Sequence, residues 1–251
     1  MTFPQPLYDA VSTHRYPLVF ATISGAHLYG FASPDSDWDL RGVHVLPAAE
    51  VLGLHEAQDT VNVDRLEDGL ELDLVTHDIR KFIELMLKPN GYVLEQLFSP
   101  LVVHTTPAHS ELIDLGRQCI RRYHAHHYLG FSANQWKLLH RDEPPRIKPL
   151  LYTFRTLLTG IRLMKTGEIE ANLTALNAEA NLSYLTDLIA RKTVGSEKER
   201  LTDDLTFFDK EFKRLTRMLE NAFEATNLPD RVPDVVRNAL SDFLVRLRMN
   251  S

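Results

Sequence analysis

A short apolar stretch that ends at a serine and a glycine constrains this chain more than any other feature. Residues 18–23 are apolar apart from one threonine and have the length of a buried strand. Ser24 and Gly25 follow directly, and Gly30 comes five residues after Gly25. Glycine lets a backbone approach a ligand closely, and successive amides in such a turn can line an anion site. The sequence therefore predicts a strand followed by a turn that fits a phosphate group.

Two aspartates begin the next apolar run. After residues 33–35 interrupt the pattern, Asp37 and Asp39 alternate with apolar residues at the start of a run that continues to Leu46. Because successive side chains of a strand point to opposite faces, both carboxylates lie on one face. They repel each other unless a cation lies between them. Mg²⁺ or Mn²⁺ is the expected cation, because hard divalent ions prefer carboxylate oxygens and bind together with substrate phosphates.

This combination resembles the signature of the DNA polymerase beta-like nucleotidyltransferase superfamily. An Asp-x-Asp pair alone is common on solvated surfaces, but a strand, a glycine turn, a fixed gap and the acidic pair rarely occur together by chance. The match covers Gly25, the small residue Ala26 and the run Asp37-Trp38-Asp39. Further residues narrow the likeness to the RNA-repair-pathway branch: Leu28, Tyr29, Gly30, Ser36, Arg41, Gly42 and Val43.

The turn supplies the first set of nucleotide-binding candidates. They are Ser24, Gly25, Ala26, Tyr29 and Gly30. Ala26 stands where the superfamily usually has Ser or Gly. We therefore expect Ser24 or the backbone amides to make the phosphate contact that the serine hydroxyl makes in the superfamily.

A predicted hairpin offers a third carboxylate. Residues 60–64 and 70–75 alternate apolar and polar side chains, and Asp68-Gly69 between them is a strong turn signal. Glu71 and Asp73 share one face, and a two-metal site needs a carboxylate from a neighbouring strand. The resemblance favours Asp73, with Glu71 as the alternative. The predicted catalytic residues and ligands of two Mg²⁺ or Mn²⁺ ions are Asp37, Asp39 and Asp73.

The pattern as a whole predicts an α+β protein, with a small mixed β-sheet nucleotidyltransferase domain and an appended α-helical domain. The 251 residues are enough for two modest domains, 1–105 and 106–251. Apolar spacings of three and four predict helices throughout the second domain. These helices cover residues 110–123, 128–140, 148–166, 182–192, 197–225 and 234–249.

Charge is divided unevenly between the two predicted domains. Residues 1–105 hold 6 Lys and Arg against 15 Asp and Glu, whereas residues 106–251 hold 22 against 19. A metal-carboxylate site beside a phosphate-binding surface would give this division, and an acidic surface that confers solubility is the alternative. The sequence has no apolar run of membrane-spanning length and no basic-then-apolar leader, so we expect a cytoplasmic protein without a membrane partner.

Cysteine and histidine offer a second type of site. Cys119 is alone, which excludes an internal disulfide and a cysteine-based metal cluster, and we expect it in the core. His124, His126 and His127, with His140, could bind a transition metal. The first three do not share a helix face, so an exposed or nucleic-acid-facing helix junction is the preferred interpretation.

One helix face of the second domain is unusually basic. It consists of Lys148, Tyr152, Arg155, Thr159 and Arg162. Spacings of 4, 3, 4 and 3 place these residues on one stripe, and no acid lies between the first and the last. The stripe resembles the helical domain of related nucleotidyltransferases, in which a Lys or Tyr reaches the phosphates. We expect it to face the metal site, with Lys148, Tyr152 and Arg155 binding the triphosphate or an RNA backbone.

Together these features predict metal-dependent nucleotidyl transfer from an NTP to an acceptor hydroxyl, with an RNA end as the acceptor. One alternative is a catalytically weak nucleotide- or RNA-binding protein on the same fold. A second is an antitoxin-like nucleotidyltransferase that modifies a protein, and a third is a metallohydrolase built on the histidines. The sequence specifies neither the base of the nucleotide nor the oligomeric state.

Overall fold

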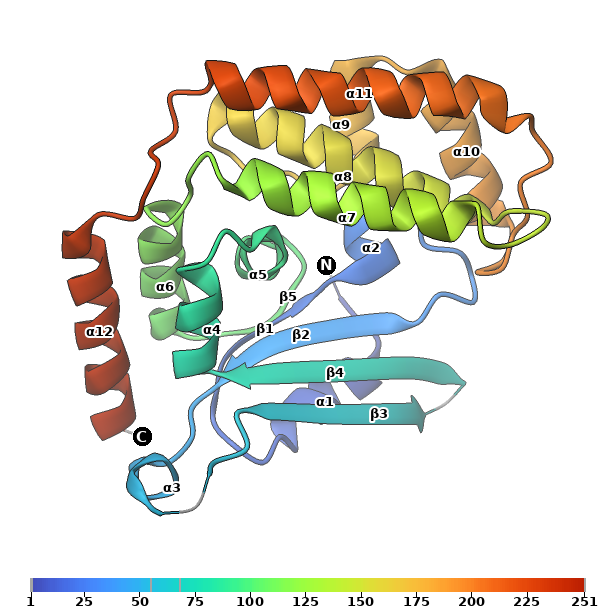
Figure 1. Ribbon diagram of the computed structural model, residues 1–251. Helices are drawn as coiled ribbons and strands as arrows, with labels where there is room; N and C mark the ends of the chain where they lie inside the picture. Colours follow the sequence, from blue (N-terminus) through green and yellow to red (C-terminus); the bar gives the residue numbers. More distant parts are fainter. Residues whose placement is uncertain (1, 55, 68, 251) are drawn as a thin grey trace. The chain divides into compact units, whose positions relative to one another are not determined.

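A five-stranded mixed β-sheet and twelve named helices make up the computed structural model, which describes residues 2–54, 56–67 and 69–250 (Figure 1). The strands are β1 (Leu18–Ile23), β2 (Trp38–His44), β3 (Thr60–Glu67), β4 (Leu70–Asp78) and β5 (Val102–Thr105). Their order in the sheet is β3-β4-β2-β1-β5. β2 and β4 run parallel, and the other neighbouring strands are antiparallel. The predicted α+β class is confirmed.

The helices lie between and after these strands. Those of the first half are α1 (Gln5–Ser12), α2 (Gly25–Tyr29), α3 (Ala48–Leu52), α4 (Ile79–Met86), α5 (Gly91–Leu97) and α6 (Pro107–Arg117). Those of the second half are α7 (His124–Leu139), α8 (Ile147–Thr166), α9 (Leu173–Ala180), α10 (Ser183–Val194), α11 (Leu205–Ala225) and α12 (Asp234–Met249). In the part of the chain that the structure describes, no helix is long and apolar enough to cross a membrane.

Two compact units divide the chain. Unit 1 holds the described residues up to 25, residues 37–120 and the residues from 231 onward, and unit 2 holds residues 26–36 and 121–230. Unit 1 therefore contains the sheet, α1, α3 to α6 and α12. The chain passes between the units at residues 25/26, 36/37, 120/121 and 230/231, so residues 26–36, in the middle of the nucleotidyltransferase motif, belong to unit 2. A domain boundary near residue 105 stays a prediction.

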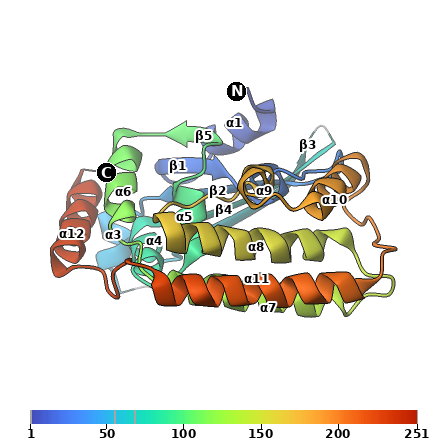
Figure 2. The same ribbon diagram turned by 90° about the horizontal axis from the view of Figure 1, so that it is seen from above.

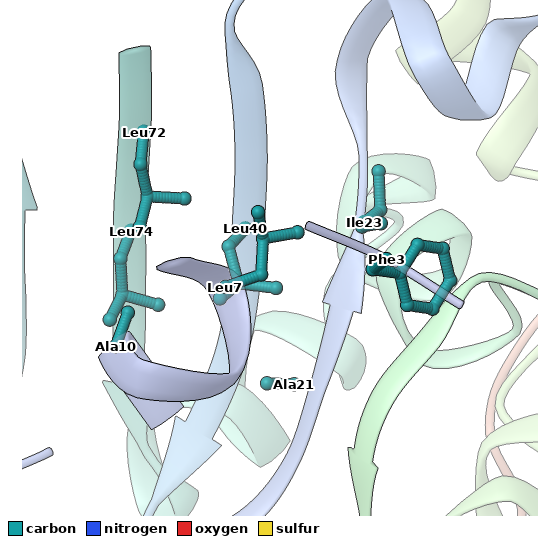
Figure 3. Packing of buried hydrophobic residues seen from close by; sticks show 8 residues of the cluster. All are labelled: Phe3, Leu7, Ala10, Ala21, Ile23, Leu40, Leu72 and Leu74. Carbon is teal, nitrogen blue, oxygen red and sulfur yellow. The ribbon is translucent and has the colours of Figure 1, made fainter. Parts of the chain in front are cut away.

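The apolar faces of β2 and β4 pack against α1 in unit 1. Leu40, Leu72 and Leu74 are almost fully buried. They form one cluster with Leu7 and Ala10 of α1 (Figure 3). Because strand side chains alternate, this burial leaves the polar side chains of the same strands on the opposite face. The predicted apolar face of the hairpin strand is confirmed.

Unit 2 is built around α8. Helices α7, α8 and α11 lie side by side in both views (Figures 1 and 2). Tyr128 of α7, Phe154 of α8 and Leu219 of α11 have no exposed side-chain surface. Removing these large apolar side chains from water is the main stabilising contribution to this layer.

Several local predictions were wrong or incomplete. The expected phosphate turn is the five-residue helix α2 instead of an irregular turn. The helix expected from residue 197 begins only at Leu205, because Asp204 caps it by accepting from the Thr206 N–H at 2.9 Å. Residues 199–201 instead pair with the segment that precedes α8. Helix α9 was not predicted, although Asn172 is its N-cap.

The remaining elements follow the sequence pattern more closely. Helix α12 begins and ends at the predicted residues, and α6 lies over residues 107–117 instead of 110–123, because Pro107 occupies its first turn. The hairpin is present, with Glu67 opposite Leu70. Gly69 has a φ of +78°, as a two-residue turn requires, and Asp68 lies outside the described residues.

Candidate active site

Asp39 and Asp73 lie opposite each other on the two parallel strands. The register pairs Asp39 of β2 with Asp73 of β4, and paired residues point to the same face of a sheet. Their neighbours Leu40 and Leu74 point into the core. The Asp39 side chain is 27% exposed and the Asp73 side chain is 39% exposed. The alternation of both strands thus brings two carboxylates together where solvent reaches them.

Arg41 binds both carboxylates through one nitrogen. Its Nη2 donates to Asp39 Oδ1 and to Asp73 Oδ2, each at 2.7 Å. Its Nη1 donates to the carbonyls of Leu40 at 3.0 Å and Asp73 at 2.7 Å. Its Nε donates to the Tyr92 hydroxyl at 3.0 Å. Since guanidinium has five N–H donors, each donor of Arg41 has a partner, and the side chain is held in one position.

The charge of Arg41 is secured by these partners. Its side chain is only 11% exposed. Burial opposes the charge of the guanidinium, but Tyr92 and the two carboxylates outweigh burial and raise the pKa of Arg41. The sequence predicted a cation between Asp37 and Asp39, and in the structure the chain itself supplies a positive charge between Asp39 and Asp73.

The carboxylate pair fits a hard divalent ion. Two oxygens that converge on one nitrogen at 2.7 Å show that Asp39 and Asp73 can share a cation, and carboxylate oxygens are the donors that Mg²⁺ and Mn²⁺ prefer. Asp37 is exposed and directly precedes β2. Across the described residues, no three His, Cys, Asp or Glu side chains form a group that could hold a metal ion. The complete ligand set of Asp37, Asp39 and Asp73 stays a prediction.

Gly25 lies directly against Asp39. The φ of Gly25 is +61°, and a Cβ at this position would lie 1.8 Å from Asp39 Oδ2. The N–H of Ser24 donates to the Asp39 carbonyl at 2.8 Å, which fixes the approach. Glycine is thus required both by the left-handed backbone and by the carboxylate packed against it.

The hydroxyl of Ser24 is buried. Within the described part of the chain, Ser24 Oγ has no hydrogen-bond partner. An unsatisfied buried hydroxyl costs free energy, so Ser24 is a suitable donor for an additional acceptor beside Gly25.

Residues 26–36, which follow Gly25 in the motif, belong to unit 2. Tyr29 is 3% exposed, and the Arg155 Cζ lies 3.8 Å from the centroid of its ring. The Tyr152 ring meets the Tyr29 ring edge-on at 5.4 Å. Gly30 has a φ of +81°, and a Cβ there would lie 2.7 Å from Asn172 Oδ1. Tyr29, Tyr152 and Arg155 therefore form a packed cluster, and any role of theirs in binding nucleotide stays a prediction.

The basic stripe of α8 is neutralised by other elements. Lys148 pairs with Glu197, and Arg162 pairs with Glu168 at 3.1 Å and with Glu179. Arg155 is buried, at 3% exposed. The helix itself lacks acids, as the sequence shows, but residues 168–197 bring acids to it from outside. Spacing within one helix could not reveal these partners.

The histidines do not form a metal site in the described structure. His124 is buried, and its Nδ1 lies 2.9 Å from the Arg121 carbonyl. Burial lowers the pKa of His124 to about 4, so this ring is neutral near pH 7. The expectation of an exposed junction was wrong for His124, whereas His126 is exposed and packs on the Phe223 ring at 4.8 Å. Cys119 is a buried free thiol, as predicted.

Four residues at or near the site were given no role in it by the sequence analysis. Arg41 and Tyr92 support the carboxylates, and Asn90 caps the helix that carries Tyr92 by accepting from its N–H at 3.1 Å. Asp64 of β3 is opposite Asp73, so Asp64, Asp73 and Asp39 form a row across three strands. The Asp-Gly turn signal in the sequence implies this hairpin register, from which the position of Asp64 opposite Asp73 could have been predicted.

Replacing Arg41 tests its role as the internal cation. Arg41→Gln leaves Asp39 and Asp73 without their shared partner, so we expect the free energy of unfolding without divalent ions to fall by about 1–3 kcal/mol. This loss is smaller than that for breaking a fully buried ion pair, because both carboxylates are partly exposed to solvent. Mn²⁺ should then stabilise this variant more than the parent. Urea unfolding with and without Mn²⁺ measures both effects. Arg80→Gln, which removes the exposed pair Arg80–Glu84, is the control, and an equal response of the two variants would refute the role.

Replacing Gly25 tests its contact with Asp39. Gly25→Ala should destabilise by about 2 kcal/mol or more, because it combines an unfavourable φ with a steric clash. Gly69→Ala is a matched control, since Gly69 has a similar φ of +78° and nothing within 4 Å of the added Cβ. Gly25→Ala should lower the unfolding free energy more than Gly69→Ala does. Adding Asp39→Ala to Gly25→Ala should recover part of this difference, because it removes the carboxylate that the new Cβ meets. Equal unfolding free energies for the two alanine variants would show that the contact is absent.

Comparisons with known proteins identify relatives of this chain. A sequence profile of the RNA repair pathway DNA polymerase beta family, RlaP, matches residues 4–246. The uncharacterized protein MJ0002 of Methanocaldococcus jannaschii is 25% identical over 226 residues, covering 87% of this chain and 90% of that protein. The uncharacterized protein YcgL of Bacillus subtilis is 27% identical over 188 residues, covering 72% and 71%.

A solved structure is also similar in part. It is a nucleotidyltransferase-like protein from Exiguobacterium sibiricum, with a TM-score of 0.34 and 10% identity over 88% of this chain and 73% of that one. The family profile spans nearly the whole chain and confirms the resemblance drawn from the motif. The chain therefore belongs to the RNA repair pathway DNA polymerase beta family, within the polymerase beta-like nucleotidyltransferase superfamily.

Proposed function

We propose that this protein transfers a nucleotidyl group from an NTP to an acceptor hydroxyl and releases pyrophosphate, with an RNA end as the acceptor. The observation that carries the proposal is that Asp39 and Asp73 converge on one cation, the Arg41 guanidinium, beside Gly25. Family membership supports the reaction class. The acceptor oxygen would attack the α-phosphorus in line as the bond to the β-phosphate oxygen breaks, so pyrophosphate leaves with that oxygen.

Asp37, Asp39 and Asp73 would hold two Mg²⁺ or Mn²⁺ ions. When bound, these ions supply charge neutralisation on the phosphates and favour ionisation of the acceptor hydroxyl. Asp73 is placed to assist removal of the acceptor proton, because its side chain is the more exposed of the pair, at 39% against 27%. Arg41 donates to one oxygen of each carboxylate, Asp39 Oδ1 and Asp73 Oδ2.

The phosphates would bind beside Gly25. Ser24 offers its buried hydroxyl there, and this donor compensates for Ala26, which has no hydroxyl. Lys148, Tyr152 and Arg155 of α8 are proposed to assist in binding the nucleotide. A protein that binds nucleotide without turnover is the alternative, and Ala26 is the residue that favours it.

Radiolabelled nucleotides test the reaction. The protein is incubated with each α-labelled NTP and Mg²⁺ or Mn²⁺, with and without total cellular RNA. We expect one NTP to label an RNA species only when a divalent ion is present. Label on a protein instead would favour a protein-modifying enzyme. Nucleotide binding without label in any acceptor would contradict catalysis.

The carboxylates can be tested one at a time. Asp39→Asn and Asp73→Asn should each lower the labelling rate at least about 100-fold, because each weakens the binding of the ions that neutralise the charge developing on the phosphates. Circular dichroism should show an intact fold. Glu71→Gln, on the same strand and exposed, is the control and should keep the parental rate. Parental rates in both aspartate variants would exclude these residues from the reaction.

A further inference from the structure

Glu197, in the segment between α10 and α11, gathers polar contacts from three parts of unit 2. Its Oε2 accepts from Lys192 Nζ at 2.8 Å and from Ser36 Oγ at 3.1 Å. Its Oε1 accepts from Lys148 Nζ. Its own N–H donates to Asp35 Oδ1 at 2.8 Å. Two cations and Ser36, the residue just before Asp37, therefore meet at one carboxylate, and Asp35 binds the backbone of the same residue.

Lys192 is the buried part of this cluster. It has no exposed surface, and its Nζ donates to Ser33 Oγ at 2.6 Å as well as to Glu197. A buried ammonium is costly unless it is paired and hydrogen-bonded. Glu197 and Ser33 satisfy this requirement, so the position of Ser33 is tied to the most strongly buried charge of unit 2.

The segment from Ser33 to Ser36 is a closed turn. The Ser36 N–H donates to the Ser33 carbonyl, and the Ser33 N–H donates to Ser36 Oγ, each at 3.0 Å. Three side chains of the turn contact the cluster: Ser33, Asp35 and Ser36. The turn is thus held internally by its own hydrogen bonds and externally by Lys192 and Glu197.

We propose that Lys192 and Glu197 are positioning residues for Asp37. They fix the turn that ends at Ser36, and this turn restricts the backbone conformation at the residue that follows it, Asp37. The inference rests on the proposed function, because it assigns Asp37 a ligand role. It also explains why a buried lysine is paired with a turn 159 residues away in sequence.

Ser36→Ala is the sharpest test, because it removes the hydrogen bonds that Ser36 Oγ makes with the Glu197 carboxylate and the Ser33 N–H and leaves the ion pairs in place. We expect Mn²⁺ affinity, measured by calorimetry, to fall several-fold, and about tenfold in Glu197→Gln. Hydrogen exchange of amides in residues 36–38 should be faster in both variants. Asp203→Asn, which breaks the Arg191–Asp203 pair of the same unit, is the control and should change neither property.

The outcomes separate the two claims. If the parent binds Mn²⁺ and both variants bind it equally well, or if exchange at residues 36–38 is unchanged, the positioning role is overturned and the proposed function stands. If the parent binds no Mn²⁺ in the presence of NTP, the proposed function fails, and the positioning role fails with it. Weaker binding and faster exchange in both variants, with the control unchanged, support the role.

Discussion

The candidate site depends on the ion pairs that Arg41 makes with Asp39 and Asp73. They join the two parallel strands β2 and β4 on the face opposite the apolar core, and they hold two like charges close together. Without a cation, this arrangement would be unstable, because like charges repel in a partly buried environment. Arg41 is itself fixed by two backbone carbonyls and Tyr92, so the geometry of the carboxylates is built into the strands.

The sequence predicts the local part of this arrangement well. The alternation of β2 and β4 requires Asp39 and Asp73 to lie opposite Leu40 and Leu74, because only one face can enter the core. It does not reveal that Gly25 packs on Asp39, since that contact joins the end of one strand to the start of another. The α+β class and family followed from the same short motif.

The parts that sequence reasoning missed depend on contacts between distant residues. Tyr92 reaches Arg41 from a helix 51 residues further along the chain, and Glu197 reaches Lys148 across 49 residues. No periodicity within one element contains such information. For the same reason the α8 stripe looked like an unneutralised basic surface, although acids from later segments pair with Lys148 and Arg162.

The central claim is that Asp39 and Asp73 form a divalent-cation site next to Gly25. Anomalous diffraction from crystals of the protein with Mn²⁺ and a non-hydrolysable NTP tests it most directly. We predict a manganese peak bonded to an oxygen of each carboxylate, with Arg41 still bound to the remaining oxygens. A nucleotide-bound structure with no peak at these carboxylates, or with manganese only at other residues, would contradict the account.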